Sequence, residues 1–152
     1  MMPDGHEAAR PIPVPDAVSA PYWSAARQHR LALQVCASCR QFQHPPAPVC
    51  RHCGARELTY SEVATRGRVY SFTVSHHNFT AETGRELPYA IGIVEVDGAD
   101  GARILANFVE TPLDAIHVGA AVDVVFEDIS AEVSLPQFRL ISDHPAQAGG
   151  DT

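Results

Sequence analysis

All four cysteines of this chain lie within one eighteen-residue stretch, CASCRQFQHPPAPVCRHC. They form two Cys-x-x-Cys pairs, Cys36 with Cys39 and Cys50 with Cys53, separated by ten residues. Two pairs at this spacing can present four sulfurs tetrahedrally to one ion, about 2.3 Å from each sulfur. The spacing therefore predicts a zinc ribbon in which Cys36, Cys39, Cys50 and Cys53 are the metal ligands. Iron in a rubredoxin-like site is the alternative occupant, notably after heterologous expression.

Other uses of the four thiols are weaker interpretations. The first residues contain no apolar run of signal-peptide length, and no run of eighteen apolar residues occurs, which predicts a cytoplasmic protein with no membrane segment. Disulfides are uncommon in that compartment. A redox pair would place its reactive cysteine at a helix N-terminus, which the flanking sequence does not suggest.

The predicted site is architectural. Four thiolates already fill a tetrahedron, so His44 and His52 are not needed as ligands, and no position is left for water or substrate. The two turns differ, because Gly54 follows Cys53 whereas Arg40 follows Cys39. A left-handed conformation at Arg40 would cost about 1 to 2 kcal/mol. Zinc binding of about 10 to 16 kcal/mol can offset that strain.

Charge divides the chain. The net charge is -7, yet residues 1–60 carry six arginines and four acidic residues (+2), whereas the remainder carries five arginines and fourteen acidic residues (-9). Arginines near the cysteines either balance the negative cluster or bind phosphates or carboxylates of a ligand or partner. The candidates for such contacts are Arg27, Arg30, Arg40 and Arg51.

The N-terminal third is expected to hold a flexible arm (1–18) and then a helix with the zinc ribbon (19–60). Four prolines precede residue 16, whereas SAPYWSAARQHR predicts a short helix with Ser19 as N-cap and an early proline. Tyr22, Trp23 and Ala26 would form its apolar face. The run LALQV then predicts a strand with inward Leu31, Leu33 and Val35.

After Gly54 the chain becomes a series of short alternating runs that predict strands: LTYSEV, GRVYSFTVS, YAIGIVEV, ARILANFVE, AAVDVVFED and PQFRLI. Two expected inner rows are Val122, Val124 and Phe126, and Tyr70, Phe72 and Val74. The segment VETPLDAIHVG predicts a short helix or turn. The fold class is thus mainly β, with a five-stranded OB-fold barrel over residues 61–142 and a disordered tail over 143–152. A small sandwich is the alternative.

With these features in place, residues 22–141 resemble a known family: bacterial and archaeal proteins with an N-terminal helix, a rubredoxin-like zinc ribbon and an OB fold, catalogued as domain of unknown function thirty-five. The features that carry the resemblance come from the whole stretch. They are Trp23, Arg30-Leu31, Leu33, the four cysteines around Pro45-Pro46, Gly67 to Val74, Pro88-Tyr89, Ile104 to Asn107, Val118-Gly119, Val122, Pro136 and Phe138.

This resemblance implies a scaffold-like accessory subunit, itself not an enzyme, that associates with thiolase-like acyl-CoA enzymes. Family members act in archaeal isoprenoid synthesis and with aldolases that shorten steroid side chains. The resemblance also implies that the OB fold contacts acyl-CoA and that the helix and ribbon pack on the partner. Tyr22 and Trp23 would then be buried only in a complex.

Two other functions have some support in the sequence. OB barrels and zinc ribbons also bind single-stranded nucleic acid, but the -9 charge of the barrel opposes phosphate attraction. The loop SHHNFTAETGRELP offers His76, His77, Glu82 and Glu86 as acids or bases, without a paired nucleophile. Because OB folds often bind through such a loop, His77, Phe79 and Arg85 are expected contacts for a ligand or partner.

Overall fold

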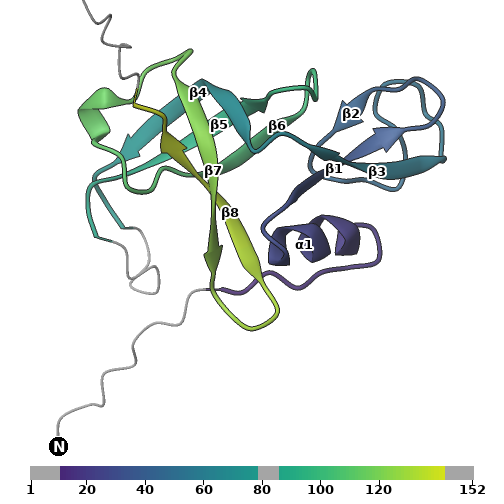
Figure 1. Cartoon of the computed structure of the whole chain (residues 1–152), viewed down its shortest axis with the longest axis horizontal. Coiled ribbons are helices and arrows are strands. Elements are labelled where there is room, and N and C mark those ends of the chain that lie inside the picture. Colours follow the sequence, from purple (N-terminus) through teal and green to yellow (C-terminus); the bar gives the residue numbers. More distant parts are fainter. Residues whose placement is uncertain (1–10, 79–85, 143–152) are drawn as a thin grey trace, which may run out of the picture.

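The computed structural model describes residues 11–78 and 86–142 and shows a helix and a small sheet beside a five-stranded barrel (Figure 1). Residues 1–10 and 143–152, which belong to the expected arm and tail, lie outside the described residues. The elements are α1 (Ala20–Arg27), β1 (Leu31–Cys36), β2 (Phe42–Gln43), β3 (Leu58–Val63), β4 (Arg66–Ser75), β5 (Tyr89–Val96), β6 (Arg103–Asn107), a 3-10 helix (Leu113–Ala115), β7 (Ala121–Asp128) and β8 (Ser134–Leu140).

The start of α1 is capped differently from the prediction. Ser19 has helical dihedral angles (φ -88, ψ -12) and caps nothing with its side chain at this helix. Instead, Asp16 accepts the Ser19 backbone N–H at 2.7 Å, and Ser19 Oγ accepts the Asp16 N–H at 3.1 Å. This reciprocal pair stabilises the turn that leads into α1, as a capping box does. The buried face of α1 consists of Tyr22, Ala25 and Ala26.

The ribbon sheet has the order β2-β1-β3, with antiparallel pairing throughout. Leu31 and Leu33 of β1 are buried, as predicted. The prediction for the rest of this strand was wrong, because Gln34 is buried and Val35 is only half-buried. A buried amide is tolerated here because its oxygen and nitrogen are both hydrogen-bonded.

The second sheet confirms the mainly β fold with an OB-type barrel. Its order is β6-β5-β4-β7-β8, all antiparallel, and a parallel bridge between Phe108 and Phe138 brings its two edges together. A sandwich is therefore excluded. Gly92 on β5 makes room for the closure, because a side chain there would begin 2.2 Å from the Phe108 ring. The 3-10 helix after β6 matches the short helix predicted in that segment.

A bulge in β4 corrects one predicted inner row. Val69 pairs with Val94 and Ser71 pairs with Ile93, so Tyr70 is an extra residue without a partner on β5. The bulge turns Val69 into the core and leaves Tyr70 49% exposed. On the outer face, the Arg103 guanidinium lies 3.6 Å from the centroid of the Tyr70 ring.

The helix and ribbon share one apolar core with the barrel. Tyr22, Leu31 and Leu33 belong to the same buried cluster as the barrel residues Val69 and Phe138. His29, just past α1, strengthens the junction: its ring stacks on Phe126 of β7 at 5.3 Å, and its Nε2 lies 2.8 Å from Asp128 Oδ1. Within residues 11–78 and 86–142, no helix has the length and apolar character that a membrane span requires.

Candidate metal centre and its surroundings

The two Cys-x-x-Cys turns have nearly the same backbone geometry. In the first turn, Arg40 N–H donates to Cys36 O at 3.0 Å; in the second, Gly54 N–H donates to Cys50 O at 3.0 Å. The residue after each second cysteine is left-handed, with φ of 65 at Arg40 and 77 at Gly54. Arg40 therefore adopts the left-handed conformation whose cost was considered from the sequence, and this arginine takes the place that a glycine would fill without strain.

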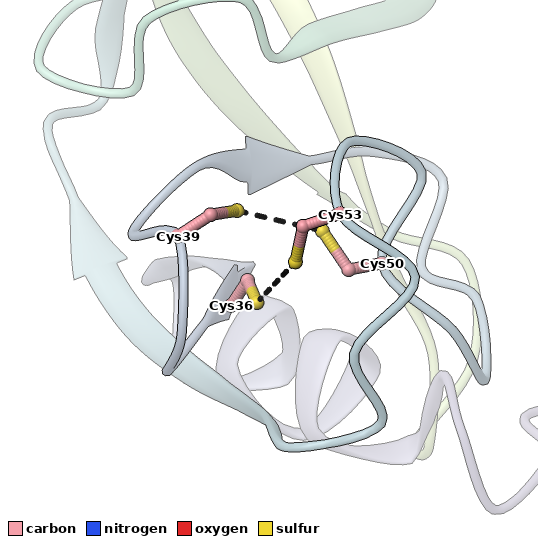
Figure 2. A group of neighbouring side chains, drawn as sticks. All are labelled: Cys36, Cys39, Cys50 and Cys53. Carbon is pink, nitrogen blue, oxygen red and sulfur yellow. Dashed lines mark hydrogen bonds between the residues drawn. The ribbon is translucent and has the colours of Figure 1, made fainter.

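The four sulfur atoms converge on one point between the two turns (Figure 2). All four lie within 4.8 Å of one another, and the pairs Cys36–Cys53 and Cys39–Cys50 are both 3.7 Å apart. A tetrahedron with vertices 2.3 Å from its centre has edges of about 3.8 Å, so the cluster fits a four-thiolate metal site. A disulfide would need a separation of about 2 Å, and the four cysteines are unpaired.

Backbone amides favour the thiolate forms of the first cysteine in each turn. The amide groups of Cys39 and Ser38 lower the pKa of Cys36 to about 6. The amide groups of Cys53 and His52 lower the pKa of Cys50 in the same way. For Cys39 and Cys53, burial and hydrogen bonds with neighbouring sulfurs outweigh the lowering by a backbone amide and raise the pKa. Since metals bind the thiolate, the turns favour the ligand form of two of the four cysteines.

The matched turns yield a prediction of opposite signs. Arg40→Gly should raise the free energy of unfolding by up to about 1 kcal/mol, because it relieves left-handed strain of about 1 to 2 kcal/mol against a smaller unfolded-state entropy cost. Gly54→Ala should lower it, since a Cβ there meets no atom within 4 Å and only the dihedral strain is added. Urea unfolding of the metal-loaded variants measures both changes. A change of the same sign in both variants would contradict the left-handed conformation of the two residues.

Two buried glutamines hold the loop between the turns, and the sequence argument missed both. Gln34 bridges the Ala47 backbone, donating to its carbonyl at 3.0 Å and accepting its N–H at 2.9 Å. Gln43 donates to Gln34 Oε1 at 2.6 Å and accepts the Arg51 N–H at 2.9 Å. These bonds replace secondary structure in the loop that carries Cys50. The only signal in the sequence was a polar residue inside the apolar run LALQV.

The arginines expected to contact a ligand or partner have different surroundings. Arg30 forms an ion pair with Glu62 at 2.8 Å. The Arg51 guanidinium donates to the His44 and Pro45 carbonyls at 3.2 and 2.5 Å, so its side chain is bound to the ribbon's own loop. Arg27 and Arg40 are exposed, and their side chains form no hydrogen bond or ion pair with another residue in the described part of the chain. These two remain the candidates for a contact outside the chain.

The remaining predicted contacts are divided between the helix and the first barrel loop. Tyr22 is 6% exposed within this chain, so the expectation that only a partner buries it was wrong. Its ring packs against Trp23 at 5.0 Å and His44 at 4.9 Å, and burial raises its pKa. Trp23 is half-buried. His77 is exposed and its carbonyl accepts Ser75 Oγ–H at 3.0 Å, whereas Phe79 and Arg85 lie outside the described residues.

These aromatic side chains form one wall of a groove between the ribbon and the barrel. The groove has a volume of about 330 Å³ and is lined by Tyr22, Trp23, residues 44–46, Asp16, Ser19 and Leu105 of β6. Burial, with the nearby charge of Arg51, lowers the pKa of His44 to about 4. His44 is therefore neutral at pH 7 and presents an uncharged ring to the groove.

Acidification should weaken the fold through His44. Its pKa is near 6.5 in the unfolded chain and about 4 in the fold, so the unfolded state binds more protons below pH 6.5 and stability falls as pH falls. Between pH 7.5 and 5.5, wild type should lose about 1 kcal/mol more unfolding free energy than His44→Phe. Urea unfolding at the two pH values tests this. Protonation of the cysteines affects wild type and His44→Phe alike, so it cancels in the comparison. An equal loss of unfolding free energy in the two proteins would contradict the prediction.

Comparison with protein families supports both parts of the fold. The rubredoxin-like zinc ribbon domain of ChsH2 matches residues 23–59, and the C-terminal OB-fold domain of ChsH2 matches residues 60–127. Among solved structures, the Ltp2-ChsH2(DUF35) aldolase contains a chain that is 35% identical, with a TM-score of 0.73. The match covers 85% of this chain and 98% of that one.

Curated relatives carry names of several enzymes and of scaffolds. A probable enoyl-CoA hydratase alpha subunit of Thermomonospora curvata is 37% identical over 88% of this chain, but the chain spans only 40% of that protein's length. A DUF35 domain-containing scaffold protein of Methanocaldococcus jannaschii is 27% identical over 64% of this chain and 67% of its own. The benzoylsuccinyl-CoA thiolase subunit BbsA of Thauera aromatica is 29% identical, with 64% and 63% covered. Together with the two domain matches and the four-cysteine cluster, these likenesses show that the chain belongs to the DUF35 family of ChsH2-type zinc-ribbon and OB-fold proteins.

Proposed function

We propose that this chain is a noncatalytic accessory subunit of a thiolase-like acyl-CoA enzyme and that its four cysteines hold a structural zinc ion. The observation that carries the proposal is the likeness to the DUF35 chain of the Ltp2-ChsH2(DUF35) aldolase, which this chain matches at 35% identity over 98% of that chain's length. A subunit role can be carried over from a match of this extent more safely than from a match to part of a longer protein.

The chemistry of the cysteine cluster favours a structural role for the metal ion. Four thiolates around one ion leave no open coordination position, so the ion would not activate water or polarise a carbonyl. The bound ion would instead fix the two turns relative to β1 and thereby brace the helix and ribbon (19–60) against the OB fold (61–142). Zinc is the occupant we propose, with iron as the alternative, because thiolate sets of this kind suit both.

The names of the relatives favour coenzyme A chemistry. One is a subunit of a hydratase of enoyl-CoA and another is a subunit of a thiolase of benzoylsuccinyl-CoA. The hydratase relative is much longer than this chain, so its reaction as a whole is not carried over. What the relatives share is membership of an assembly, which supports a scaffold whose OB fold contacts acyl-CoA or the partner. We place this assembly in the cytoplasm, where free thiols persist as metal ligands.

Single-stranded nucleic acid is the less favoured partner. The barrel half of the sequence has five arginines against fourteen acidic residues, and a strand of phosphates would be repelled there. No relative described above is named for nucleic-acid binding.

Affinity purification of the tagged chain from its native lysate tests the proposal. We expect a thiolase-like enzyme in stoichiometric amount, whose turnover of an acyl-CoA requires this chain, while the chain alone turns over nothing. His77→Ala serves as the control for residual activity, since His77 is one of the loop residues that could act as an acid or base. Recovery of a monomer without such an enzyme would contradict the proposal. Turnover by the isolated chain, lost in His77→Ala, would show that it is an enzyme itself.

A further inference from the structure

Strand β6 pairs with β5 along one edge only. The bond from Phe108 N–H to Ala90 O (3.0 Å) sets the alternation of the antiparallel ladder. In such a ladder, every second residue directs its peptide N–H and C=O toward the neighbouring strand. Counting back in twos from Phe108, Ala106 and Ile104 direct theirs toward β5, in the observed register.

The peptide groups of Arg103, Leu105 and Asn107 accordingly point away from β5. Asn107 is covered, because its N–H donates to the side chain of Gln137 on β8 at 2.9 Å. No hydrogen bond links the Arg103 or Leu105 backbone to β8 in the described part of the chain. The first half of β6 is thus an open strand edge, which native proteins usually cover or blunt.

The open edge borders the aromatic groove. Leu105 is 68% exposed and lines the groove together with Trp23, Tyr22 and His44. Helix α1 and the ribbon lie beside the barrel (Figure 1), and both line the groove together with Leu105 of β6. An exposed leucine next to aromatic rings and an unpaired strand edge is a typical site for strand addition by a peptide.

The electrostatics of the groove indicate which peptide fits. Asp16 is the only carboxylate or cation among its lining residues, since the neutral His44 carries no charge at pH 7. The hydroxyl and backbone N–H of Ser19 lower the pKa of Asp16, so this carboxylate is ionised. A fixed negative charge at the rim of an apolar groove complements a basic side chain.

We propose that an extended segment of the partner enzyme docks on β6 as an added strand, with an apolar side chain in the groove and a basic side chain near Asp16. This inference rests on the proposed function, which supplies the partner. The backbone of Arg103 and Leu105 would provide two N–H donors and two carbonyl acceptors. The groove residues would select the side chains of the added strand.

Two matched substitutions on the barrel test whether the groove beside Leu105 is the docking surface for the partner enzyme. Leu105→Asp should weaken binding to the co-purified thiolase-like enzyme at least tenfold, whereas Val118→Asp should leave it unchanged. Leu105 and Val118 are comparably exposed, at 68% and 65%, so neither change should disturb the fold, which the melting temperatures check. Equal affinities of the two variants would overturn the docking surface while leaving the accessory role intact. If the wild-type chain binds no such enzyme, the proposed function fails and this inference fails with it.

Hydrogen exchange distinguishes strand addition from a side-chain contact. In the isolated chain, the outward amides of Arg103 and Leu105 should exchange much faster than those of Ile104 and Ala106, which lie in the ladder. In the complex, the two fast amides should slow at least tenfold. Unchanged exchange at both positions in a formed complex would overturn strand addition. Slowing that depends on the concentration of the isolated chain would assign the edge to a second copy and overturn the partner segment.

Discussion

Cys50→Ser should abolish stoichiometric metal binding and unfold the ribbon. Structural zinc in small cysteine-rich modules contributes about 10 to 16 kcal/mol, which equals or exceeds the total stability of an ordinary domain. The ribbon itself has only three short strands and a loop held by two glutamines, so little else would maintain it. Because Leu31 and Leu33 belong to the core cluster that includes Phe138, the barrel should also melt at a lower temperature.

Elemental analysis and thermal unfolding together measure this effect. Wild type should hold one ion per chain, and Cys50→Ser close to none, with a melting temperature lower by more than about 10 °C. Ala37→Ser is the control, since it introduces a serine at an exposed position beside Cys36 and leaves all four thiols. A Cys50→Ser protein with full metal content and an unchanged melting curve would show that the cluster is not the metal site.

The cysteine cluster could be predicted because its geometry depends on local chain properties. Each Cys-x-x-Cys pair forms one turn, and the strand before Cys36 delivers the first turn to the second. The strands of the barrel were predictable for a similar reason: alternation along a single run shows which residues face inward. The number of strands and the short helix after β6 indicated an OB-type barrel, whereas the strand order and the bridge between Phe108 and Phe138 are seen only in the structure.

What could not be predicted depends on contacts between distant segments. Gln34 is buried because residues 43–49 fold over it, and nothing within LALQV shows that cover. The bulge at Tyr70 reverses the facing of part of β4, and a single extra residue has no signature in an alternating run. Tyr22 packs against His44 of the ribbon loop, although the sequence suggested that only a partner would bury Tyr22.

The partners of the arginine side chains could not be predicted from the sequence either. Arg30 and Arg51 lie in a stretch without carboxylates, residues 17–56, and the sequence left open whether they balance the cysteine cluster or bind a ligand or partner. In the fold, Arg30 meets Glu62 of β3, and Arg51 meets two carbonyl groups of its own loop. The sequence shows the charge of a local stretch, whereas the ion-pair partner of an arginine can come from a neighbouring strand of the sheet. Arg27 and Arg40 keep the role first considered for all four.

Phe138→Ala should be the most damaging substitution in the barrel. The side chain is 0% exposed, its ring lies 6.2 Å from that of Phe108, and its strand supplies the bridge that brings the edges of the sheet together. Removing a buried phenylalanine costs about 3 to 5 kcal/mol through lost burial and the cavity left behind. The melting temperature should fall by about 10 °C or more.

Tyr70→Ala provides the matched control, because it also removes an aromatic ring, but from the outer face of the same barrel. Its expected cost is below about 1 kcal/mol, mainly from the lost contact with Arg103. Phe138→Ala should keep its metal, since the cysteines lie in the ribbon, so the two large effects can be separated: one variant loses the ion and the other loses barrel packing. Similar costs for Phe138→Ala and Tyr70→Ala would mean that the bridge between Phe108 and Phe138 does not close a packed core.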